Sequence, residues 1–377
     1  MISDATTEVH IDLGQLSNNI ALLQRASAPA PIMGVVKADA YGHGAPAVCR
    51  RLLQAGVRHV AVATCQEAER LRGTPEGKDL AILVFAPPLP HQWSSMQALQ
   101  LGANITSVTQ IMELASLGRD SDPLRVHLKI DTGMHRLGIP IDEASEALSA
   151  LQSLDGIRVE SVWTHFATAD LVRDSTYANY QWHLFVAWYA SLDPVTRPPI
   201  HAANSPGLFT QRPSSQHPSV SLTRPGIALY GMLEPQIDTA PFGTLKPLLE
   251  LRSRLTQVTR VKQGATISYG QRYTCTTDRW IGTVGGGYAD GVPRLLTNQG
   301  RVSIQDRNYP MVGTICMDMF MVDLGDASKP CPASRGDAVS IFGGGGMPVQ
   351  RVAEICGTIP YEICCHIGAR VPRRYFG

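Results

Sequence analysis

The sequence predicts an α/β protein in which a parallel (β/α)8 barrel of the TIM type is followed by a second, mainly β domain. In roughly the first 240 residues, β-rich runs alternate with stretches whose apolar residues recur at helical spacing. Parallel neighbouring strands need a crossover connection, which is usually a helix, so this alternation indicates a barrel. Beyond it, short β-rich runs follow one another with little helical spacing. A chain of 377 residues is also long for a single core.

The barrel is predicted element by element from this alternation. A β-rich run at 6–13 and a helical stretch at 16–26 come before the repeating pattern. The eight barrel strands are predicted at 32–37, 59–63, 80–85, 104–108, 124–130, 157–165, 200–203 and 222–229. The helices between them include 46–55, 111–117, 142–154 and 177–192.

The second domain begins after a linker at 234–243, which is rich in proline and glycine. We place the barrel in residues 1–240 and the β domain in 241–377, and leave open that the strand at 6–13 packs with the second domain. The strands of this domain are predicted at 248–261, 279–284, 301–304, 310–324 and 338–342, and its helices at 352–356 and 360–367.

Composition excludes several classes of protein. The net charge is +1 with acids and bases interspersed, which argues against a nucleic-acid or membrane-surface partner. We find neither a signal peptide nor an apolar run long enough for a bilayer. The eight cysteines have no metal-ligand or disulfide spacing, so we expect reduced thiols, no metal and a cytoplasmic location. The glycine runs at 285–287 and 343–346 are not followed by helix-like sequence, which makes a dinucleotide site a poor prediction.

The chemistry is predicted to begin at Lys37, which ends the first barrel strand. An amine beside buried strands loses its charge readily, and it can form a Schiff base with an aldehyde. Tyr41, four residues on, is near enough to hold a phosphate oxygen of the same ligand. A lysine at a strand end is more often a solvated surface residue, so the prediction depends on what the other strand ends carry.

Unusual residues also end the later strands, and in such barrels the chemistry lies at the carboxyl ends. The loop after strand five carries Lys129 and Arg136, and strand six ends at His165. Strand seven runs into Asn204 and Ser205, and strand eight into Arg224, Gly226 and Ile227. Backbone amides after these two strands are the common phosphate site of the fold, and Ser205, Gly226 and Ile227 suit that role. Each residue has an ordinary structural explanation. Together on one rim they predict a phosphate-bearing aldehyde cofactor attached to Lys37.

A set of motifs resembles the alanine racemase family, pyridoxal 5'-phosphate enzymes of the barrel-plus-β-domain type. The motifs are VVKADAYGHG, HLKIDTGMHRLG, WTHFATAD, HAANSPG, TRPGIALYG, ISYG, GGGYADG, GTICMD and IPYEI. They occur in the family's order, and the resemblance runs from about residue 10 to Arg370–Tyr375. Each motif is modest alone, but the set is specific. The resemblance implies an isomerase that interconverts L- and D-alanine and supplies D-alanine as a peptidoglycan precursor.

The resemblance also implies roles for individual residues. Lys37 binds the cofactor aldehyde, Arg224 faces the pyridine nitrogen, and Arg136 lies near the phenolic oxygen and the substrate. The phosphate is surrounded by Tyr41, Ser205, Gly226, Ile227 and Tyr361, and His165 and Asn204 complete the cofactor site. Lys129 matches a lysine that is carbamylated in many members.

Further roles imply a homodimer with shared active sites. In the family, the second catalytic base and a residue at the substrate carboxylate come from the partner subunit; these correspond to Tyr269 and Met317. Asp170, Tyr288 and Ile359 correspond to the substrate access corridor. Racemisation removes the α proton from one face and returns it to the other, so one base per face, Lys37 and Tyr269, is the simplest arrangement. A phenol with an ordinary pKa of about 10 is a poor base at neutral pH, so we expect His165, linked to Arg224, to assist it.

Two cations are predicted to control the cofactor. A protonated pyridine about 3 Å from Arg224, at an effective dielectric of about 20, costs roughly 5 kcal/mol, enough to keep the ring nitrogen unprotonated and to favour racemisation over transamination. Strand five puts Lys129 beside Arg136 in a partly buried site. Desolvation and this neighbour favour the neutral amine, which can add carbon dioxide.

Three alternatives remain at this stage. A racemase of broader specificity or for serine shares every catalytic residue, and Thr314 favours it, because several relatives carry an arginine there whose loss would widen the corridor. His135, where relatives often have glycine, is a smaller departure. A non-catalytic pyridoxal-phosphate carrier would not need Tyr269. A barrel decarboxylase is disfavoured by Arg224, because a carboxylate would suit that chemistry better.

Overall fold

The computed structural model describes residues 5–117 and 122–377 and divides the chain into two compact units. The first, which we call the barrel unit, contains residues 16–40 and 45–246. The second, the β unit, contains the N-terminal segment up to Gln15, the short segment Tyr41–Gly44 and everything from Pro247 onward. The chain therefore leaves the barrel unit for four residues immediately after the turn that follows Lys37.

The barrel unit is built on parallel strands in the order β2-β3-β4-β5-β6-β8-β9. Their bounds are Met33–Val35, His59–Val62, Ala81–Val84, Gly102–Ile105, Leu124–Asp131, Ile157–Trp163 and Ile200–His201. Parallel bridges from Ile200 to Val220 and from Thr223 to Ile32 return the path from β9 to β2. The predicted barrel is therefore confirmed. The eighth predicted strand, 222–229, is wrong in extent: it holds only an isolated bridge at Thr223, and Ile227–Tyr230 forms a 3-10 helix.

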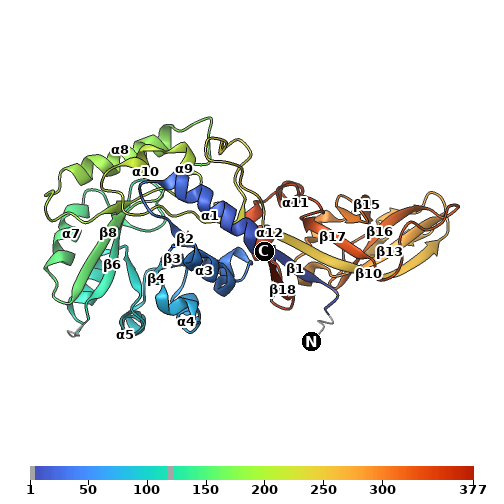
Figure 1. Ribbon diagram of the computed structural model, residues 1–377, viewed down its shortest axis with the longest axis horizontal. Helices are drawn as coiled ribbons and strands as arrows, with labels where there is room; N and C mark the ends of the chain where they lie inside the picture. The colour runs from blue at the N-terminus through green and yellow to red at the C-terminus, as the bar shows by residue number, and fades with distance from the viewer. Residues whose placement is uncertain (1–4, 118–121) are drawn as a thin grey trace. The chain divides into compact units, whose positions relative to one another are not determined.

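Helices connect these strands, as the alternation predicts. Their bounds are α1 Leu13–Ser27, α3 Ala45–Gln54, α4 Cys65–Arg72, α5 Trp93–Ala98, α6 Val108–Ala115, α7 Ala144–Ser153, α8 Thr176–Ala190, α9 Gly207–Thr210 and α10 Pro213–Gln216. In Figure 1, α7 and α8 lie outside β6 and β8. Helix α1 begins three residues before the predicted 16, because the Asp12 carboxylate accepts from the Gln15 amide (2.8 Å) and caps it. No described helix has both the length and the apolar character needed to cross a membrane.

The β unit contains an eight-stranded sheet in the order β13-β16-β15-β14-β17-β10-β1-β18, with β10 also paired to β13. The bounds are β1 Glu8–Asp12, β10 Leu249–Val261, β13 Arg279–Gly285, β14 Arg301–Ile304, β15 Arg307–Val312, β16 Met319–Asp326, β17 Ala338–Gly343 and β18 Arg373–Phe376. Strand β10 has register shifts at Leu251/Arg252 and Leu255/Gln257, and such bulges bend it so that it reaches both β17 and β13. Six strands thereby close into a ring.

In the β unit, one predicted strand is in fact two strands, and a short ribbon is present that was not predicted. The run predicted at 310–324 is two strands, β15 and β16, separated by the loop 313–318 that carries Thr314 and Met317. A two-stranded ribbon, β11 Thr266–Ile267 and β12 Tyr273–Thr274, flanks Tyr269. Helices α11 Val349–Cys356 and α12 Pro360–Cys365 occur near the predicted positions. Strand β1 pairs with β10 and β18 within this unit.

Candidate active site

Lys37 begins a short left-handed turn, α2 Lys37–Tyr41. The four residues from Ala38 to Tyr41 all have φ between 51° and 55°, although none is glycine. Such a backbone costs roughly 1–2 kcal/mol per residue, so the surroundings must hold it. The Glu67 carboxylate accepts from the Ala38 amide (2.6 Å), and the Asp39 carboxylate accepts from the Ala45 amide (2.7 Å). The sequence predicts only a glycine-rich turn here, since nothing in Ala-Asp-Ala-Tyr signals left-handed backbone.

Glu67 is the residue that ties this turn to the next strand end. Its second carboxylate oxygen accepts from the amides of Ala63 (2.7 Å) and Thr64 (3.2 Å) at the start of α4, where Thr64 and Glu67 form a capping box. One side chain therefore fixes the ends of β2 and β3 together and positions Lys37.

Arg224 is buried with only 2% of its surface exposed. Its Nη2 donates to the carbonyl oxygens of Thr164 and Ala202 (both 2.8 Å) and lies 3.3 Å from His165 Nδ1. Its Nη1 donates to His201 Nδ1 (2.6 Å). The hydrogen bond expected between His165 and Arg224 is therefore present. Burial lowers the pKa of Arg224 to about 9, which leaves the guanidinium charged at neutral pH.

A chain of hydrogen bonds runs from Arg224 into the barrel interior, and we call His201, Ser161 and His127 the histidine column. A guanidinium only donates, so His201 Nδ1 must accept and its proton must lie on Nε2. Nε2 then donates to Ser161 Oγ (2.8 Å), whose hydroxyl donates to His127 Nδ1 (2.7 Å). Burial lowers the pKa of His127 to about 3 and that of His201 well below its ordinary value, so both rings are neutral.

Trp163 contacts both buried cations of the barrel. The guanidinium carbon of Arg224 lies 4.6 Å from the centre of its ring, and Lys129 Nζ lies 5.3 Å from it. Lys129 is 2% exposed and donates to the Leu137 carbonyl oxygen (2.6 Å). Burial, and then Arg224 and Arg136, lower its pKa to about 8 against the opposing effect of Asp131. The partly buried pair expected of Lys129 and Arg136 is wrong in one respect: Lys129 is buried, but Arg136 is exposed.

Four cations gather around His165. Burial lowers the pKa of this histidine well below its ordinary value, and Arg224, Arg136, Lys129 and Lys37 each lower it further. The strand ends of the barrel unit thus bring together four of the predicted site residues as a concentration of positive charge. This donor set fits a cofactor that carries a phosphate and a phenolic oxygen.

The residues predicted around the phosphate divide between the two units. In the barrel unit, Ser205 Oγ accepts from the amides of Gly226 (2.8 Å) and Ala228 (3.2 Å), beside the first residue of the 3-10 helix, Ile227. Asn204 uses its amide oxygen to accept from Gly207 (2.9 Å), which is a structural cap. In the β unit, the rings of Tyr41 and Tyr361 lie 5.9 Å apart.

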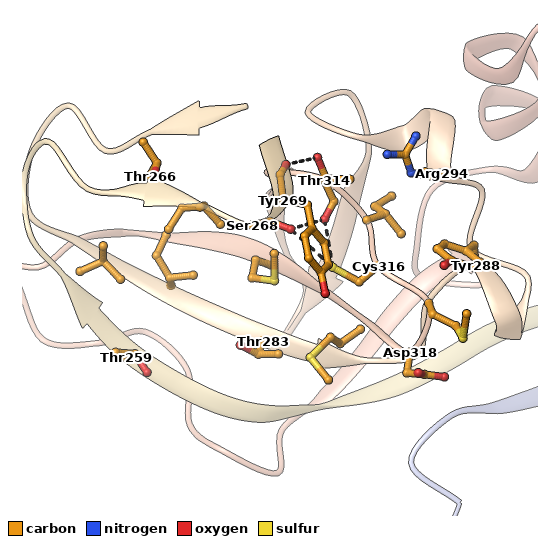
Figure 2. Close-up of a pocket in the computed structure, with 17 residues that line it drawn as sticks. Thr259, Thr266, Ser268, Tyr269, Thr283, Tyr288, Arg294, Thr314, Cys316 and Asp318 are labelled. Carbon is orange, nitrogen blue, oxygen red and sulfur yellow. Dashed lines mark hydrogen bonds between the residues drawn. The ribbon is translucent and has the colours of Figure 1, made fainter. Parts of the chain in front are cut away.

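The β unit carries a separate pocket of about 870 Å³, shown in Figure 2. Tyr269, Tyr288 and Met317 line it, and their exposed fractions are 75%, 45% and 51%. The ring of Tyr269 projects into this pocket. Thr314 also lines it, and its side chain is only 2% exposed. Of the other predicted corridor residues, Ile359 is exposed in the β unit, and Asp170 is partly buried in the barrel unit.

The barrel, its lysine at the first strand end and the surrounding cations define an enzyme that binds a phosphate-bearing aldehyde cofactor. The family descriptions "Alanine racemase, N-terminal domain" and "Alanine racemase, C-terminal domain" match residues 11–234 and 248–375. The chain belongs to the alanine racemase family, whose members depend on pyridoxal 5'-phosphate. The predicted family, cofactor and class of enzyme are confirmed.

Individual relatives agree over nearly the whole chain. The alanine racemase of Desulforamulus reducens is 37% identical over 97% of this chain and 98% of its own, and that of Geobacter sulfurreducens is 38% identical over 98% and 97%. Among solved structures, alanine racemase from E. faecalis has a TM-score of 0.88 at 32% identity, covering 100% of both chains. The biosynthetic alanine racemase from Pseudomonas aeruginosa has a TM-score of 0.86 at 33% identity, covering 99% of both.

Sequence reasoning missed several residues that build the site: Glu67, Ser161, Trp163, His201 and Ser268. One signal was available for some of them. Side chains two apart on a strand share a face, so Ser161 and Trp163, both in β8, point to the same side. The register that pairs His127 with Ser161, and Trp163 with His201, appears only in the folded sheet.

The histidine column predicts how stability depends on pH. The folded-state pKa values of His127 and His201 are depressed, so the unfolded chain binds more protons below pH about 6.5 and stability is lost as the pH falls. Below that pH, each ring lowers the free energy of unfolding by about 1.4 kcal/mol per pH unit, and the two rings together by roughly 3 kcal/mol per pH unit. Urea unfolding of the purified protein at pH 6 and pH 5 measures this slope. His127→Gln should lower the slope by about 1.4 kcal/mol per pH unit, the contribution of one ring, whereas the exposed His183→Gln should leave it unchanged. An unchanged slope in His127→Gln contradicts the assignment.

Proposed function

We propose that this protein interconverts L- and D-alanine by a two-base mechanism, in a homodimer whose active sites are shared. Lys37 of one subunit and Tyr269 of the partner subunit are the two bases. The family and the names of its relatives support alanine as the substrate. The proposal places the enzyme in the cytoplasm, which its eight free cysteines support.

The observation that carries the shared site is the exposure of Tyr269. A base that moves an α proton works best where water is excluded, yet this side chain is 75% exposed in its own chain. Its pocket also exposes Met317 and Met319, and an open surface of this kind is typical of a protein interface. A second copy of the chain could cover the pocket and receive the tyrosine at its own barrel rim, and a two-fold arrangement would complete both sites at once.

The residues of this chain then divide the work. Bound pyridoxal phosphate supplies the electron sink that makes the α proton of an amino acid removable. The Lys37 amine takes or returns the proton on one face of the substrate, and the Tyr269 hydroxyl does so on the other. Arg224 would hold the pyridine nitrogen and would oppose its protonation, because the guanidinium keeps its own charge. This keeps the electron sink weak and favours prompt return of the proton.

The remaining predicted residues bind and orient. Arg136 and Met317 are assigned to the substrate and the phenolic oxygen, and Asp170, Tyr288 and Ile359 to the access corridor. The phosphate is assigned to the hydroxyls of Tyr41, Ser205 and Tyr361 and to the segment Gly226–Ile227, where the Gly226 amide holds Ser205 in place. Asn204 supports this group through the Gly207 turn, and His165 connects Arg224 to the side where Tyr269 acts.

Mixing two inactive variants tests the shared site. Lys37→Ala and Tyr269→Phe each lose one base from both sites, but a heterodimer has one site with both bases. Random exchange makes about half of the dimers heterodimers, so D-alanine formation should recover to roughly one quarter of the wild-type rate. In the matched control, Lys37→Ala is mixed with the double variant Lys37→Ala/Tyr269→Phe, and no site regains both bases. Full activity in a verified monomer, or no recovery when native mass spectrometry detects heterodimers, would overturn the proposal.

Lys129 is assigned as a carbamate, formed when its neutral amine adds carbon dioxide and releases a proton. A pKa near 8 makes the neutral amine far more abundant than in an ordinary lysine, and the new negative charge would lie near Arg136 and Arg224. Protein equilibrated with 13C-bicarbonate should therefore show one carbamate signal by 13C NMR. Lys129→Ala should lack that signal and lose activity that small carboxylates partly restore. Lys37→Ala should retain the carbamate signal. An unmodified Lys129 with no anion beside it, or full activity of Lys129→Ala without added carboxylate, contradicts the assignment.

A further inference from the structure

Two loops of the β unit hold each other through reciprocal hydrogen bonds directly beneath Tyr269. Thr314 Oγ1 donates to the Tyr269 carbonyl oxygen (2.7 Å), and Ser268 Oγ donates to the Thr314 carbonyl oxygen (2.7 Å). Figure 2 shows both bonds at the wall of the pocket. We call this pair of bonds the 268–314 clamp. It fixes the backbone on both sides of the Cα from which the exposed tyrosine ring projects.

The backbone at the clamp is strained. Ser268 has φ 63° and ψ −174°, a region that side chains other than glycine avoid. Gly270 and Gln271 follow with φ of 73° and 52°. A backbone of this kind persists only where surrounding contacts over-determine it, and the two clamp bonds are such contacts. The strained backbone therefore helps to set the direction in which the Tyr269 side chain projects.

The opposite side of the clamp is anchored separately. Gly313 has φ 73°, and a Cβ there would lie 2.7 Å from the Ile267 carbonyl oxygen, so the loop approaches the tyrosine segment more closely than any other residue allows. The Gly313 amide donates to Asn298 Oδ1 (2.6 Å), and Asn298 Nδ2 donates to the Arg272 carbonyl oxygen (2.8 Å). Thr314 is thus held on a fixed support, and the tyrosine segment is held against it.

The hydroxyl of Thr314 is the part of this residue that the contact requires. The side chain lines the pocket but is only 2% exposed, whereas Tyr269 is 75% exposed. Valine would fill the same volume, but only a hydroxyl can donate to the Tyr269 carbonyl oxygen. We propose that Thr314 is a positioning residue for the second base: it fixes the backbone of Tyr269 and so aims the phenol at the α carbon of the substrate. This inference rests on the proposed role of Tyr269.

The direct test compares Thr314→Val, which keeps the shape, with Thr314→Ser, which keeps the hydroxyl. Small displacements of a reacting group are costly, so Thr314→Val should lower kcat about tenfold with little change in KM, and Thr314→Ser should restore it to within about twofold. Thr256→Val is the matched control, since this exposed threonine lies outside the pocket and its hydroxyl also donates to a backbone carbonyl oxygen, that of Thr283 (3.1 Å). Hydrogen exchange of the segment 267–272 should be faster in Thr314→Val only.

Isotope effects separate positioning from general damage. A displaced phenol slows proton transfer on one face only, so with α-deuterated alanine the two enantiomers should respond in opposite senses. In Thr314→Val, the primary isotope effect should rise for the enantiomer whose α proton faces Tyr269 and fall for the enantiomer whose α proton faces Lys37. A loss of folded protein would lower the rates for both and leave the isotope effects unchanged. Should Thr314→Val fail to fold, Ser268→Ala breaks the other clamp bond and is expected to give the same pattern.

The outcomes distinguish this inference from the function on which it rests. Unchanged kcat and isotope effects in Thr314→Val, with Tyr269→Phe inactive, would overturn the positioning role and leave the two-base proposal standing. Wild-type racemisation in Tyr269→Phe would remove the second base and the positioning role with it. A loss in Thr314→Ser with none in Thr314→Val would show that the volume of the side chain, and not its hydroxyl, is what the site needs.

Discussion

A guanidinium that is buried and must remain charged sets the character of the barrel interior. Transferring an isolated ion out of water costs several kcal/mol even after the protein relaxes, and an arginine has no acceptor atoms with which to adapt. Everything that touches the Arg224 nitrogens must therefore accept. The structure meets this demand with two carbonyl oxygens, two neutral imidazoles and the face of Trp163. The pKa of Arg224 falls only to about 9, so the charge survives burial.

The same demand propagates through the polar core. Because Arg224 can only donate, it fixes the proton of His201 on Nε2, which fixes the direction of the Ser161 hydroxyl and then the tautomer of His127. A barrel interior filled by aliphatic side chains could not support the cation, since each unmet polar atom would cost about 1–3 kcal/mol. The histidine column puts polar side chains where apolar ones could pack. Its hydrogen bonds fix the orientation of the groups around Arg224 at the strand ends.

Much of the fold and of the candidate site could be predicted from the sequence. The features that could not be predicted have one cause in common: they arise only when distant residues meet or when the backbone takes an unusual conformation. The lysine after the first strand, the cations after strands five and eight, and the change to short β runs are all visible along the chain. The pairing of His127, Ser161 and His201 is not, because residues 34 and 40 positions from Ser161 meet only through the parallel register. Left-handed backbone at Ala38 and Ser268 is equally invisible, because no glycine signals it.

Both proposed bases lie next to strained backbone. The type of residue at such a position does not reveal this strain or the hydrogen bonds that hold it. Lys37 is followed by four left-handed residues tied to Glu67 and Asp39, and Tyr269 is preceded by Ser268 in a region normally reserved for glycine. Strain of about 1–3 kcal/mol at such a position is retained only when neighbouring hydrogen bonds over-determine it. Read as a missing arginine, Thr314 suggests a wider corridor. Its hydroxyl donates to the Tyr269 carbonyl oxygen, so the consequence of this substitution depends also on the bond that the threonine makes.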